Sequence, residues 1–198
     1  MYFHKTPHNS MDFRYSLPPE SKAKLFFNAD DDLIFTCDKL TKAFHKWKKF
    51  YIGDIVPLLG YRTMSFNFDS ENGDFDVKNI RVSPMFRQTL IGLTWISRHF
   101  LDLYNANQTW EVQEIRKIVA ETNNCDDLAM NFIVNHFYRE IHSVQIDYDD
   151  VTIDIYAKNR QAMTKNFVLN RNGCNKKFVE IFGYNPLPTV AKFPKENY

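Results

Sequence analysis

Three consecutive carboxylates, Asp30, Asp31 and Asp32, are the residues whose types and spacing most directly suggest chemistry. They follow the apolar run 25–27, and an apolar run resumes at 33–35. Adjacent carboxylates repel one another and resist burial, and a bound cation relieves both costs. Mg²⁺ and Mn²⁺ bind oxygen ligands, usually one or two carboxylates and the phosphates of a substrate. We therefore expect Asp30 and Asp32 to hold a divalent metal that clamps a diphosphate, with an acidic surface turn as the alternative.

A second acidic pair, Asp126 and Asp127, stands at the predicted start of a helix. Carboxylates at this position interact favourably with the helix macrodipole. Both cannot cap the helix, so one of them can point into a cleft, and the N–H groups of a helix start favour an anionic ligand nearby. Asp127 is therefore a candidate catalytic residue, with helix capping as the alternative.

Arg171 is the candidate cation for the same chemistry, because a guanidinium is always charged and its fork matches phosphate oxygens. The chain has three cysteines, so at most one intramolecular pair can form. Cys125 and Cys174 each lie at a predicted helix start, and if they pair, Arg171 comes close to Asp127. The alternative is an arginine on the surface.

Composition restricts the class of protein that can position these groups. The chain has 198 residues with 44% hydrophobic content, which suffices for one domain with a sizeable core. The formal net charge of +1 and the lack of a long basic stripe disfavour nucleic acid as a partner. No apolar stretch has the length of a membrane span, and residues 1–5 lack the apolar centre of a signal peptide.

The order of the predicted elements indicates an α/β sheet with helices packed on it. The apolar run at 24–29 predicts a buried parallel strand, because strands covered on both faces are continuously apolar. Ligands of such sheets bind beyond the carboxyl ends of the strands. The other expected strands are 52–59, 85–91 and 143–155 (one or two strands), the expected helices are 39–50, 94–104, 110–121, 125–137 and 174–182, and 66–79 is expected to be a loop or hairpin.

Five segments resemble, in order, the carboxyl-terminal domain of the exostosins and exostosin-like proteins, glycosyltransferase family 64. The most specific are the run Asn-Cys-Asp-Asp-Leu-Ala-Met-Asn-Phe-Ile-Val at 124–134 and the ending at 171–187, which includes Phe-Gly-Tyr-x-Pro-Leu. The other three segments are 9–14, 28–32 and 38–62.

This resemblance implies a single domain over 1–198 with a GT-A-like α/β fold, a mixed sheet flanked by helices. The chain starts where the family is already past its first strand and helix, so we expect a domain that is truncated at its N-terminus. The implied activity is the transfer of an N-acetylhexosamine from a UDP-sugar to a glycan or glycolipid acceptor, with retention at the anomeric carbon and dependence on Mn²⁺. The implied location is the lumen of the Golgi or endoplasmic reticulum, with a membrane anchor upstream of this chain.

The resemblance also implies individual roles. Asp32 is the closest Mn²⁺ ligand, together with Asp30; Asp127 lies at the anomeric centre, and Arg171 supports the leaving UDP. Residues expected to bind the substrate are Asn9, Arg14, Asp30, Asp31, Arg62 and Asp126.

The resemblance implies roles for the cysteines as well, and the sequence itself marks one asparagine. Cys125 and Cys174 correspond to the family's disulfide, and Cys37 is expected to be free and buried. The sequon at Asn107 is a glycosylation site if the chain is lumenal. The alternative to an enzyme is a non-catalytic or truncated lumenal domain of the same fold, acting as a partner or acceptor-binding module. The absent first strand and the altered region 147–165 favour that alternative.

Overall fold

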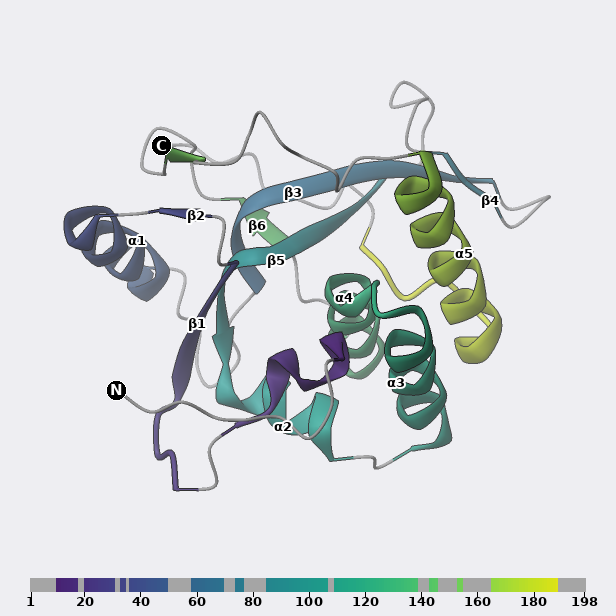
Figure 1. Ribbon diagram of the computed structural model, residues 1–198, viewed down its shortest axis with the longest axis horizontal. Helices are drawn as coiled ribbons and strands as arrows, with labels where there is room; N and C mark the ends of the chain where they lie inside the picture. Colours follow the sequence, from purple (N-terminus) through teal and green to yellow (C-terminus); the bar gives the residue numbers. More distant parts are fainter. Residues whose placement is uncertain are drawn as a thin grey trace.

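Two long strands, β3 (Leu58–Asp69) and β5 (Met85–Ser97), form the centre of the fold in the computed structural model (Figure 1). They pair antiparallel within a sheet of order β1-β5-β3-β4, in which β1 is Leu25–Ala29 and β4 is Asp74–Asp76. The short strand β6 (Ser143–Gln145) runs parallel to β3, so the sheet is mixed. The structure describes residues 10–17, 20–30, 33–34, 36–49, 58–69, 74–76, 85–106, 109–138, 143–145, 153–154 and 165–188.

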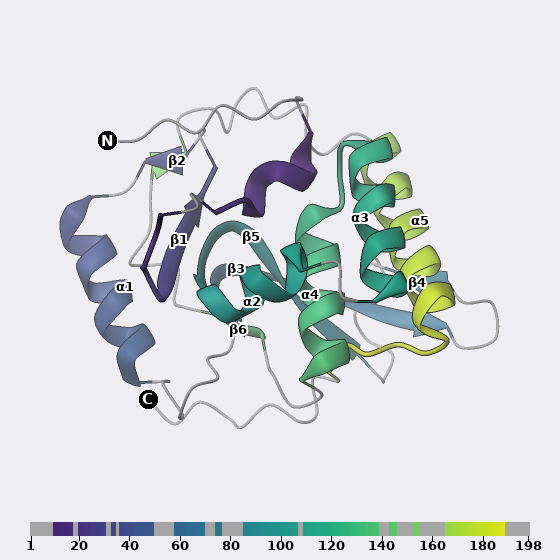
Figure 2. The same cartoon turned by 90° about the horizontal axis from the view of Figure 1, so that it is seen from below.

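Helices pack against this sheet and against one another. Figures 1 and 2 show α3, α4 and α5 side by side at one end of the molecule and α1 at the other end, beside β1. The 3-10 turn η1 lies between β1 and the helices α3 and α4. The bounds of these elements are η1 (Met11–Tyr15), α1 (Cys37–Lys49), α2 (Arg98–Asn105), α3 (Trp110–Thr122), α4 (Asp126–Phe137) and α5 (Lys165–Phe182), and a separate two-stranded sheet pairs β2 (Leu33–Ile34) with β7 (Ile153–Asp154).

The core lies between β5 and the helices α2 to α5. Helix α4 is buried on all sides, because its first ten residues, Asp126 to Asn135, are all buried. Burying a large apolar side chain contributes roughly 1.5–3 kcal/mol relative to leaving it exposed. The largest fully buried side chains are Tyr15, Tyr104, Phe100, Phe132, Phe178, Leu58, Ile91, Ile96, Ile115 and Leu128.

Strand β1 lies where the sequence predicts it, but the prediction of a buried parallel strand is wrong. β1 pairs antiparallel with β5 and is only partly buried. The reason given for its apolar run nevertheless holds in part, because each face of β1 packs against other side chains. Phe27 packs against Trp95, which also contacts Phe44 of α1, while Phe26 packs against the core.

Strand β5 is longer than predicted and continues through Gly92 to Ser97. The prediction of a helix over 94–104 is therefore wrong in its first part. Trp95 and Ile96 pair with β1, and aromatic and β-branched side chains favour such pairing. Ser97 then caps α2, its side chain accepting a hydrogen bond from the N–H of Phe100 at 3.4 Å.

Helices α3 and α4 lie where their apolar periodicity predicts them, and the region 66–79 contains the β3–β4 hairpin. Two details are wrong. The helix expected from residue 125 begins one residue later, because Cys125 is the N-cap of α4, and Asn123 closes α3 with a φ of 47°. Helix α5 starts at Lys165, so Cys174 lies inside the helix and not at its start. The predicted strand 52–59 lies mostly outside the described residues, and β3 is described from Leu58.

Candidate active site

The side chain of Arg14 joins the two acidic runs. Its Nη1 donates to Oδ2 of Asp126 at 2.9 Å, and its Nη2 forms an ion pair with Oδ1 of Asp30. The three residues are more than ten positions apart in the chain, and the fold brings them into one site. Asp30 of the first acidic run and Asp126 of the second therefore lie in one site.

The turn that carries Arg14 is itself fixed by a further ion pair, between Asp12 and Arg116. Asp12 accepts two hydrogen bonds from the Arg116 guanidinium, at 2.9 and 2.8 Å, and one from the Tyr104 hydroxyl at 3.1 Å. Paired bonds from a guanidinium fork to one carboxylate fix orientation as well as position. Arg116 lies on α3 and Tyr104 on α2, so two helices hold η1 in place (Figure 2).

The end of β1 and the start of α4 are attached to the same edge of β5. β1 pairs with β5 only as far as Leu93, and the N–H of Asp30 then donates to the carbonyl of Gly92 at 2.7 Å. Further along this edge, Asn131 of α4 accepts from the N–H of Thr89 at 2.9 Å and donates to its carbonyl at 2.8 Å. The amide thus satisfies backbone groups that β1 does not reach.

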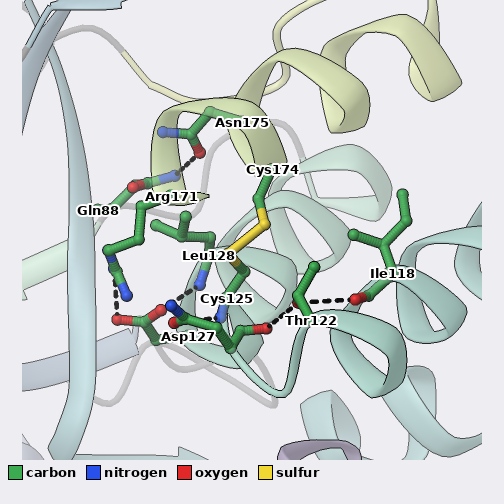
Figure 3. The surroundings of a disulfide bond; sticks show 10 residues. Gln88, Ile118, Thr122, Cys125, Asp127, Leu128, Arg171, Cys174 and Asn175 are labelled. Atoms are coloured by element: carbon green, nitrogen blue, oxygen red, sulfur yellow. Dashed lines mark hydrogen bonds and ion pairs between the residues drawn. A yellow bond between two sulfur atoms is a disulfide. The ribbon is translucent and has the colours of Figure 1, made fainter. Parts of the chain in front are cut away.

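The same amide also fixes the first turn of α4, because Asn131 Nδ2 lies 2.7 Å from the carbonyl oxygen of Asp127. Asp127 in turn contacts Arg171 of α5, with 2.7 Å between Nη2 and Oδ2. Its other oxygen accepts a hydrogen bond from the N–H of Leu128 at 2.8 Å. Figure 3 shows the guanidinium pointing at the carboxylate beside the disulfide.

The disulfide joins Cys125 and Cys174, as the resemblance implies, with 6.4 Å between their Cα atoms. It ties the residue before α4 to the interior of α5, one turn from Arg171. Cys125 itself has a φ of 68°, a left-handed conformation that costs a non-glycine residue on the order of 1–3 kcal/mol. This conformation turns the chain sharply between α3 and α4, so that Asp126 and Asp127 face the site.

Burial and neighbouring charges shape the electrostatics of this site. Burial, and then the charge of Asp127, raise the pKa of Asp126 to about 6, although Arg14 opposes the shift. Burial lowers the pKa of Arg171, but the charge and hydrogen bond of Asp127, together with the charges of Asp126 and Tyr15, outweigh it, so the pKa of this guanidinium lies above its ordinary value. Burial also raises the pKa of Tyr15, whose hydroxyl donates to Asp126 at 3.2 Å. Tyr15 is thus a neutral hydrogen-bond donor at physiological pH.

Several expected site residues lie outside the described residues: Asn9, Asp31, Asp32 and the sequon at Asn107. Arg62 lies on β3 opposite Leu90, which places its backbone in the sheet. Among the residues that the structure describes, no group of three His, Cys, Asp or Glu side chains forms a metal site. The prediction of a metal held by Asp30 and Asp32 thus stays a prediction.

Sequence reasoning missed three residues of this site: Tyr15, Asn131 and Gly92. A usable signal exists for Asn131, which lies one helical turn after Asp127 on the same face of α4. The expectation that Cys37 is buried is wrong, because its side chain is exposed at the start of α1. The described helices include none that is long and apolar enough to cross a membrane.

Comparison with known proteins shows which family and which relatives the chain is similar to. The model of the glycosyl transferase family 64 domain matches residues 1–194. Exostosin-like 2 of Homo sapiens is 24% identical over 204 residues, which cover 96% of this chain and 60% of that protein. Exostosin-2 of Homo sapiens is 24% identical over 188 residues (94% and 25%). Glucosamine inositolphosphorylceramide transferase 1 of Arabidopsis thaliana is 23% identical over 182 residues (88% and 22%). The chain thus spans less than two thirds of the length of each of these relatives.

Proposed function

The chain belongs to glycosyl transferase family 64, and on that premise we propose that it transfers an N-acetylhexosamine from a UDP-sugar to a glycan or glycolipid acceptor. The proposed reaction retains the configuration of the anomeric carbon and depends on Mn²⁺. The observation that carries the proposal is the buried pair of Asp127 and Arg171, which a disulfide holds beside the Arg14 bridge between the two acidic runs.

Asp127 is the residue that we assign to the sugar. Both of its oxygens are held, one by Arg171 and one by the N–H of Leu128, so its carboxylate is kept in one orientation. A carboxylate fixed at the anomeric centre stabilises the positive charge that develops there when the glycosidic bond to the diphosphate breaks, or attacks that centre. Both roles use the negative charge of the carboxylate, and Arg171 holds that carboxylate at 2.7 Å.

Arg171 and Arg14 are the residues that we assign to the diphosphate. Three carboxylates and two guanidiniums meet at the described site, so the arginines are largely neutralised before a donor binds. A diphosphate offers each guanidinium a further acceptor with matching geometry. The negative charge that grows on the leaving UDP strengthens these contacts in the transition state, and contacts of this kind accelerate a reaction.

The donor set fits a hard divalent cation. Asp30 places a carboxylate, 34% exposed, at the open end of β1, and carboxylate oxygens with substrate phosphates are the usual ligands of such ions. Asp30 and Asp32 would hold the ion, which when bound supplies positive charge to the diphosphate. Arg14 then keeps Asp30 in place from the protein side.

Two further parts of the proposal concern the acceptor and the compartment. The family match supports a sugar donor and an acceptor, and the relative named glucosamine inositolphosphorylceramide transferase supports a glycolipid within the proposed acceptor class. The disulfide supports an oxidising compartment, and we propose the lumen of the Golgi or endoplasmic reticulum.

The test is release of UDP from UDP-N-acetylglucosamine and UDP-N-acetylgalactosamine by the full-length protein with Mn²⁺. D127N should reduce the rate at least about a hundredfold while UDP affinity changes little, because Asp127 acts on the sugar. The control is E114Q on α3, because the side chain of Glu114 is partly exposed and lies outside the site. This variant should keep the wild-type rate. UDP binding without turnover of either donor would favour the non-catalytic alternative over the enzyme.

A further inference from the structure

We propose that Gly92 is a positioning residue of the site. Because it has no side chain, it leaves the space that the carboxylate of Asp30 occupies when it pairs with Arg14. A glycine inside a strand weakens the strand and usually marks a close approach of another group. Gly92 lies in the interior of the 13-residue strand β5. The part of the inference that concerns donor binding rests on the proposed function.

The close approach is made by Asp30 itself. The register of β1 on β5 pairs Ala29 with Leu93, which places Asp30 directly opposite Gly92. A Cβ at Gly92 would lie 2.1 Å from Oδ2 and 2.9 Å from Cγ of Asp30. Both distances are far below van der Waals contact, so any other residue here forces the carboxylate to move.

Backbone conformation gives no competing reason for the glycine. Gly183, which ends α5, has a φ of 72°, in the region that glycine favours. Gly92 has no such positive φ and follows the strand. What position 92 requires is space above the Cα atom, and the group that fills this space is Asp30.

The consequence of filling this space falls on the side chain of Asp30 and not on the strands. The N–H of Asp30 donates to the carbonyl of Gly92 at 2.7 Å, and the β1–β5 ladder ends there, so the main chain is held. The carboxylate is 34% exposed and can rotate toward solvent. That rotation breaks its ion pair with Arg14 and displaces an expected metal ligand at little cost in stability.

The experiment compares G92A with G173A in the full-length protein. Gly173 lies on α5 and is the matched control, because a Cβ there has no atom within 4 Å. UDP is titrated into each variant in the presence of MnCl₂. The affinity for UDP should be about tenfold or more weaker in G92A and unchanged in G173A, because a small displacement of a positioned group weakens its contacts. A crystal structure of G92A should show Asp30 turned away from Arg14.

The outcomes are separable from those of the proposed function. If the wild type binds no UDP, the proposed function fails and the structure of G92A alone decides the inference. G92A with the Asp30–Arg14 pair intact, or with wild-type affinity for UDP, overturns it. If G92A does not fold, the variant D30A/G92A decides. Recovery of folding without the carboxylate supports the inference, and continued failure to fold contradicts it.

Discussion

D126N should change stability in a way that depends on pH. Burial and the charge of Asp127 raise the pKa of Asp126 from 3.8 to about 6. This difference of about two units corresponds to about 3 kcal/mol, at about 1.36 kcal/mol per unit. Between the two pKa values the folded chain binds more protons than the unfolded chain, so this group lowers the free energy of unfolding as pH rises.

The variant D126N lacks this titration and keeps the local hydrogen bonds. Arg14 Nη1 and the Tyr15 hydroxyl both donate to the same oxygen, Oδ2 of Asp126, and the carbonyl oxygen of an asparagine accepts both. The free energy of unfolding of D126N minus that of the wild type should therefore increase from pH 4 to pH 7. The expected increase is about 1–3 kcal/mol, its upper end being the whole pKa difference.

The assay is urea denaturation at several pH values between 4 and 7.5, with D102N as the control. Asp102 forms an exposed pair with Arg98 on α2, and such pairs contribute at most about 1 kcal/mol. The D102N difference should therefore stay within about 1 kcal/mol at all of these pH values. A D126N difference that is flat or decreases with pH would refute the reasoning, because Asp126 would then be no more costly to ionise in the folded chain than in water.

Three other substitutions test the parts that hold the site together. R171M should lower the free energy of unfolding by about 3–5 kcal/mol in urea denaturation, because it leaves a buried carboxylate on α4 without its partner; a loss below 1 kcal/mol would contradict the burial of that pair. C125S/C174S should lower it by about 4 kcal/mol in the chain-entropy model for a separation of 49 residues, whereas C37S should have no effect on the melting temperature. R116K keeps the charge but loses the paired hydrogen bonds that hold η1, so a loss of about 1–3 kcal/mol and weaker UDP binding are expected; unchanged UDP affinity would show that η1 does not need them.

The features of this site that could be predicted from the sequence are those that depend on local patterns or on a covalent bond. The apolar periodicity of α3 and α4 placed both helices within a residue or two. The conditional pairing of Cys125 with Cys174 placed Arg171 beside Asp127, and the structure confirms this contact. The first inference needs only local periodicity, and the second needs a covalent link between two segments 49 residues apart.

The features that could not be predicted from the sequence depend on non-covalent contacts between distant segments. The bridge from Arg14 to Asp126 spans 112 positions and depends on a single 3-10 turn held by Arg116, and no periodicity reports such a contact. The strand expected at 85–91 stops before Gly92, because a glycine often interrupts a strand. In the structure it continues the strand and makes room for Asp30, which only the β1–β5 register reveals.

The central claim is that Asp30, Arg14 and the Asp127–Arg171 pair form one site for a UDP-sugar and its metal. Calorimetric titration of UDP into the full-length protein, with Mn²⁺ and then with EDTA, tests it most directly. The account predicts saturable binding with Mn²⁺ that EDTA abolishes and that R171M weakens. Absence of binding with Mn²⁺ present, or binding that neither EDTA nor R171M changes, would contradict it.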